Sequence, residues 1–86
     1  MPEISRFFGI VIQMFYNDHA PPHFHAKYGE HVARYEIATL EVISGALPRR
    51  AHGLVLEWAA LHRPELQADW ALARAERPLV PVAPLE

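Results

Sequence analysis

Three of the six histidines in this chain lie close together around two prolines, and they are the residues best suited to chemistry. Alternate residues of a strand point to the same side, about 6.6 Å apart. His23 and His25 can therefore converge on one metal ion at about 2.0–2.1 Å. With His19 as a third ligand, braced by Pro21 and Pro22, the spacing predicts a three-histidine site with one open position. Zinc, nickel or ferrous iron would suit it.

Two other interpretations of these histidines remain open. Histidine titrates near neutral pH, so His23 and His25 could perform acid–base catalysis on a phosphodiester, as in a ribonuclease. Arg34 would then hold the anion, and Glu36 is a further catalytic candidate. In the metal site, Asp18 or Glu36 would orient a histidine ring. Alternatively, the histidines are structural or surface residues that flank a buried Phe24.

A predicted hairpin decides which side chains share a face with these histidines. Gly29 and Glu30 form a two-residue turn between strands at residues 23–28 and about 31–38. This register gathers the mostly apolar side chains on one face, whereas a slip by one residue would mix the faces. The polar face pairs His23 with Glu36 and His25 with Arg34, and we expect both rings to be in contact with solvent.

The remaining elements predict an α+β fold in a single domain, residues 1–86. Residues 7–16 carry β-branched and aromatic side chains without charge, and they predict one central strand. A further strand is expected at about 41–46. Helices are expected from Pro48 and from Pro64, with an end before Pro78. The architecture is thus a small antiparallel sheet of about four strands over residues 7–46. Two C-terminal helices at about 48–77 pack on one face, and an extended tail follows at 78–86.

Arg49 and Arg50 fall in the first turn of the first predicted helix. Positive charge there opposes the helix dipole at a cost of about 0.3–1 kcal/mol. A bound anion would relieve that cost by using the free N–H groups. The alternative is an ordinary solvated pair, or pairing with Glu41 or Glu57.

Composition excludes several classes of protein. The chain has 86 residues, no cysteine and a net charge of −2. It therefore has no disulfide scaffold, no thiolate zinc site and no basic surface for duplex nucleic acid. Its apolar runs are too short for a membrane span, and its N-terminus lacks the order of a signal peptide. We expect a cytoplasmic protein.

The chain resembles a small prokaryotic family described as domain of unknown function 4160. The resemblance covers nearly the whole chain, from Pro2 to about Leu85, and its most specific part is His19-x-Pro21-Pro22-His23-Phe24-His25. Other matching stretches are residues 3–10, 17–18, 26–29, 47–51 and 55–62. It implies a cytosolic complex with a small protein encoded nearby, in an arrangement similar to toxin–antitoxin pairs. It assigns no activity and no catalytic residues. An exposed sheet face and the apolar tail make self-association a further expectation.

Overall fold

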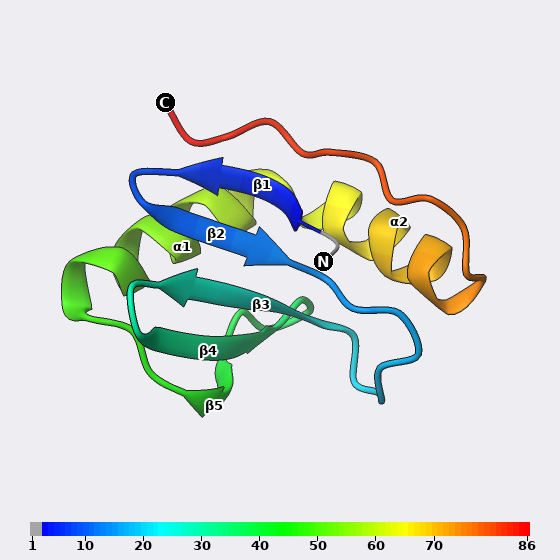
Figure 1. Ribbon diagram of the computed structural model, residues 1–86, viewed down its shortest axis with the longest axis horizontal. Coiled ribbons are helices and arrows are strands. Elements are labelled where there is room, and N and C mark those ends of the chain that lie inside the picture. Colours follow the sequence, from blue (N-terminus) through cyan, green and yellow to red (C-terminus); the bar gives the residue numbers. More distant parts are fainter. Residues whose placement is uncertain (1–2) are drawn as a thin grey trace.

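The computed structural model describes residues 3–86, which form a five-stranded sheet followed by two helices (Figure 1). The strands are β1 (Glu3–Phe7), β2 (Ile10–Gln13), β3 (His23–Tyr28), β4 (His31–Glu36) and β5 (Val42–Gly45). They pair in chain order, each antiparallel to the next. The helices are α1 (Arg49–Leu61) and α2 (Arg63–Arg74). The predicted α+β class is confirmed, with one more strand than expected.

The additional strand comes from residues 7–16, for which a single strand was the wrong prediction. The chain turns at Phe8 and Gly9, so β1 and β2 form a hairpin of their own. Both turn residues have positive φ, 49° and 80°, which a two-residue type I′ turn requires. Glycine adopts this conformation readily, but an exposed phenylalanine there is unusual. Because Phe8 continues the apolar run, the sequence pattern gave no indication of the turn at this position.

The β3–β4 hairpin has the predicted register. Phe24 pairs with Tyr35 and Ala26 with Ala33, and all four side chains are buried. On the other face, His23 pairs with Glu36 and His25 with Arg34. The β4 strand ends at Glu36, two residues earlier than expected.

The core lies between the sheet and the helices, which pack on one face. The fully buried indole of Trp58 in α1 is its centre, with ring centroids 5.3 Å from Phe7 and 5.9 Å from Phe24. The α1 helix begins one residue after Pro48, and Pro64 lies at the second position of α2, where its missing N–H costs nothing. Among residues 3–86, neither helix combines the length and apolar character needed to cross a membrane.

The C-terminal segment is extended and runs beside β1 (Figure 1). The Val82 N–H donates to the Ile4 carbonyl at 2.7 Å. The indole N–H of Trp58 donates to the Ala83 carbonyl at 2.8 Å. These bonds tie the tail to the first strand and to the core helix.

Candidate functional site

The loop between β2 and β3 carries Asp18 over the start of β3. Asn17 has a φ of 59°, a left-handed conformation that asparagine tolerates, and this residue helps to reverse the chain. Asp18 Oδ1 then accepts the His19 backbone N–H at 3.1 Å. This bond fixes the carboxylate, and its other oxygen turns toward His23.

His23, the first residue of β3, is held at both ring nitrogens. Its Nδ1 lies 2.7 Å from the Pro21 carbonyl, which can only accept, so Nδ1 carries a proton. Its Nε2 lies 3.0 Å from Asp18 Oδ2. Nε2 can therefore share a proton with the carboxylate or offer its lone pair to a metal ion. A backbone carbonyl that accepts from the opposite nitrogen is the usual support of a metal-binding histidine.

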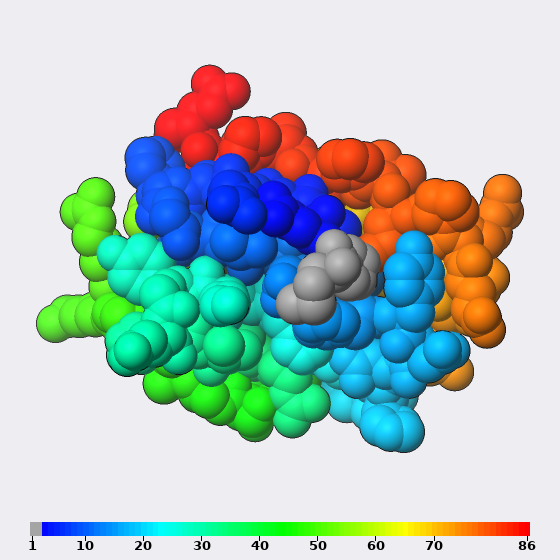
Figure 2. Space-filling view, viewed as in Figure 1, coloured from blue at the N-terminus to red at the C-terminus, as the bar shows by residue number. Residues whose placement is uncertain are grey.

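The expectation that both rings are in contact with solvent is wrong for His23. Its side chain is only 3% exposed, because the Asp18 loop covers it and Trp70 of α2 packs against it at 5.3 Å between ring centroids. Figure 2 shows this loop, in light blue, lying against α2, in orange. The alternation of the hairpin residues could not predict that the Asp18 loop and Trp70 would cover this ring.

His25 lies two residues further along β3, on the same side as His23. The two ring centroids are 5.4 Å apart, and the Phe15 ring meets His25 edge-on at 4.5 Å. The Nδ1 atom of His25 is buried and has no hydrogen-bond partner among the described residues. Burial lowers the pKa of His25, and the positive charge of His23 lowers it further. Asp18 opposes this shift and Arg34 adds to it. The neutral imidazole, which has a free lone pair, is thus favoured.

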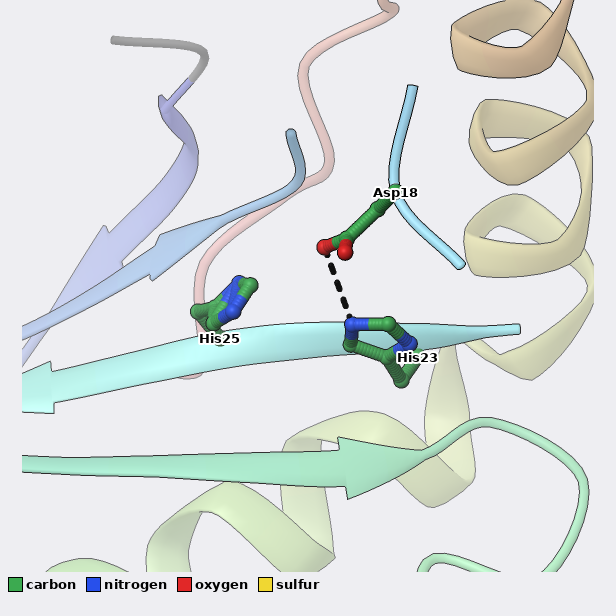
Figure 3. Close-up of side chains that lie close together, drawn as sticks. All are labelled: Asp18, His23 and His25. Atoms are coloured by element: carbon green, nitrogen blue, oxygen red, sulfur yellow. Dashed lines mark hydrogen bonds and ion pairs between the residues drawn. The ribbon is translucent and has the colours of Figure 1, made fainter. Parts of the chain in front are cut away.

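Asp18, His23 and His25 together form what we call the Asp–His cluster (Figure 3). One ligand atom from each residue lies within 4.8 Å of the other two. Ligands bound to one zinc ion at about 2.0–2.1 Å are at most about 4.2 Å apart, so small side-chain rotations would close the site. Two imidazoles and one carboxylate form a donor set that first-row divalent metals accept.

The structure gathers only part of the predicted metal site. His23 and His25 come together, but the exposed His19 is outside the cluster, and Asp18 takes the third position. We predicted Asp18 only as a residue that orients a ring. The turn-forming pair Asn17-Asp18 was a sequence signal that the loop would fold back, but it does not reveal where the carboxylate points.

The predicted partners on the same sheet face point elsewhere. Arg34 Nε donates to Ser44 Oγ in β5 at 2.7 Å, and Glu36 Oε1 accepts from Thr39 Oγ1 at 3.1 Å. Each of the two charged side chains thus has its own hydrogen bond away from the histidines.

Arg49 and Arg50 are exposed at the start of α1, where Pro48 supplies no side-chain cap. Arg50 lines a depression of about 200 Å³ together with Phe8 and Tyr28. Their role in binding an anion stays a prediction.

A second depression, of about 390 Å³, adjoins the Asp–His cluster. It shares Asp18 with the cluster, and its other lining residues are Asn17, His19, Ala20 and Arg74. The predicted helix surface gave no reason to single out Arg74, which reaches the site only because α2 packs beside the loop.

Comparison with known proteins gives a match, and it includes the residues of the Asp–His cluster. One protein-family model, described as "Domain of unknown function (DUF4160)", matches residues 9–71. No curated protein and no solved structure matches the chain. The matched residues include all three members of the Asp–His cluster and cover more than half of the chain. This chain therefore belongs to the DUF4160 family.

Proposed function

We propose that the protein binds a divalent first-row metal ion through Asp18, His23 and His25. The observation that carries the proposal is the buried, unpartnered Nδ1 of His25 beside a His23 ring that is already oriented. A buried polar atom without a partner costs about 1–3 kcal/mol. The cost is removed if a bound ion draws this ring into coordination.

The donor set narrows the choice of metal. Two histidines and one carboxylate with open positions are typical of ferrous iron, and three protein ligands plus water are typical of catalytic zinc. Nickel also accepts imidazole ligands. Hydrolysis or another reaction at the open positions would follow from a bound ion, which supplies a Lewis acid and an activated water.

The metal-free alternative, acid–base catalysis on a phosphodiester, is less well supported by the geometry. It needs His23 to meet a substrate and Arg34 to hold the anion. His23 is almost fully buried, and the Nε–H of Arg34 donates to Ser44.

Metal analysis of protein purified without an affinity tag tests the proposal. We expect close to one ion per chain, or stoichiometric uptake when Zn²⁺, Ni²⁺ or Fe²⁺ is added to chelator-treated protein. The variant His25→Leu should lose this uptake. His31→Ala, which removes an exposed histidine outside the cluster, is the matched control. Only trace metal and no saturable uptake would refute the proposal.

We also propose that the protein acts in the cytoplasm as one component of a two-gene module similar to toxin–antitoxin pairs, through contact with a small partner protein. The resemblance described above suggests the module. The structure favours β5 as the contact, because this edge strand exposes Val42 and Ile43, each 40%. Strand addition by a partner would pair the open edge and cover these side chains.

Co-purification with the product of the neighbouring gene tests this second proposal. We expect a complex that Ile43→Lys weakens and that Leu61→Lys leaves intact. Leu61 is an exposed leucine, 65%, at the end of α1, so its variant controls for the added charge. If the neighbouring product does not bind, or if both variants bind equally well, the proposed contact is wrong.

A further inference from the structure

The depression beside the Asp–His cluster is lined mainly by hydrogen-bond donors. Asn17 contributes an amide, His19 a ring exposed to solvent and Arg74 a guanidinium. Among the described residues that line it, Asp18 is the only carboxylate; its Oδ1 accepts the His19 backbone N–H, and its Oδ2 faces His23 Nε2 in the Asp–His cluster. The other polar side chains are therefore available for a ligand that accepts hydrogen bonds.

Arg74 has no ion-pair partner among residues 3–86. It lies in the last turn of α2, where a positive charge suits the helix dipole, but no carboxylate occupies its five donors. A guanidinium matches the geometry of carboxylate and phosphate groups with two parallel hydrogen bonds. The place of Arg74 in the lining of the depression thus favours an oxyanion as the ligand.

The net charge of the Asp–His cluster with a metal ion bound also favours an anionic ligand. A divalent ion held by one carboxylate and two neutral imidazoles keeps one net positive charge, and Arg74 adds another. This local positive charge contrasts with the net charge of −2 on the whole chain. It would attract a small anion to the depression.

We propose that the depression binds a phosphate group, with one oxygen on the metal ion and the others on Arg74 and its neighbours. This proposal rests on the metal site proposed above. It assigns to Arg74 the recognition of the ligand and to the Asp–His cluster the coordination of its oxygen. The ligand class is therefore phosphate or a phosphate monoester, small enough for a shallow site.

Cobalt-loaded protein gives a direct test, because Co²⁺ can replace zinc and its visible absorption reports a change of ligand. We expect added inorganic phosphate to shift this absorption saturably, and acetate to need at least about tenfold higher concentration. Arg74→Ala should bind cobalt as the unmodified protein does but weaken phosphate binding about tenfold or more, the loss of one charge-assisted contact. Arg77→Ala removes the same charge from a nearby exposed arginine and should leave phosphate binding unchanged.

The outcomes separate the two proposals. Cobalt binding without a phosphate response, equal binding of acetate, or equal weakening in Arg74→Ala and Arg77→Ala would overturn the phosphate site and leave the metal site standing. Failure of cobalt to bind would overturn both. A phenyl phosphate titration then distinguishes the sources: binding as tight as that of phosphate indicates a monoester ligand, and binding of phosphate alone indicates the free anion.

Discussion

Replacing Asp18 with asparagine should destabilise the metal-free protein, because His23 depends on this carboxylate. The ring of His23 is 3% exposed and its Nε2 lies 3.0 Å from Asp18 Oδ2, so water cannot easily replace the lost partner. Hydrogen bonds to charged groups contribute about 1.5–3 kcal/mol. Asp18 itself is 22% exposed, which weakens the interaction. We therefore expect a loss of about 1–2 kcal/mol, or about 4–16 °C in melting temperature.

Urea denaturation in the presence of a chelator measures this loss, with tryptophan fluorescence as the signal. Trp70 packs against His23 and should report any change there. His19→Ala is the control, because it removes the neighbouring exposed ring and leaves the ion pair intact. A double-mutant cycle of Asp18→Asn with His23→Gln should give a coupling energy of about 1 kcal/mol or more. Coupling within the usual additivity error of about 0.3–0.5 kcal/mol would refute the reasoning.

Three further predictions concern the scaffold. Gly45→Ala should cost at least about 2 kcal/mol in urea denaturation, because φ is 75° and the added Cβ would meet the Val32 carbonyl; Gly53→Ala, a helical site with open space, should stabilise by about 0.5–1 kcal/mol. Burial raises the pKa of Asp69, so the folded state holds its proton more tightly than the unfolded chain does. Stability should therefore fall as pH rises from about 4 through the raised pKa, and Asp69→Asn should flatten that slope in thermal melts. Burial also raises the pKa of Tyr35 to about 12, so ultraviolet titration should show one tyrosine that ionises near this pH and that Tyr35→Phe removes, and stability should fall between about pH 10 and 12.

The β3–β4 hairpin could be predicted from the sequence because its signals agree. Apolar residues alternate on both strands, and Gly29-Glu30 lies between them, so only one register buries Phe24 and Tyr35 together. The β1–β2 hairpin could not be found in the same way. Residues 7–16 are apolar on both faces, and such a segment gives no alternation to locate a turn. A single glycine after Phe8 was too weak a signal against that background.

The candidate site was predictable only as far as local periodicity extends. The period of two in a strand places His23 and His25 on one side, and they do lie there. The burial of His23 depends on Trp70, which is far along the chain, and on a loop that folds back over the sheet. Which residue joins the pair was therefore decided by tertiary packing, and the choice of Asp18 over its neighbour His19 could not be read from spacing.

The two edges of the sheet differ, because the C-terminal tail lies along one of them. Beside β1, the tail occupies the space of a sixth strand, and Val82 bonds to Ile4. Beyond β5, residues 3–86 provide no further strand. A sheet with one free border can accept one added strand, and that pairing uses up the free border of both molecules. If two copies of this chain pair by strand addition at β5, we therefore expect a dimer and not a fibre.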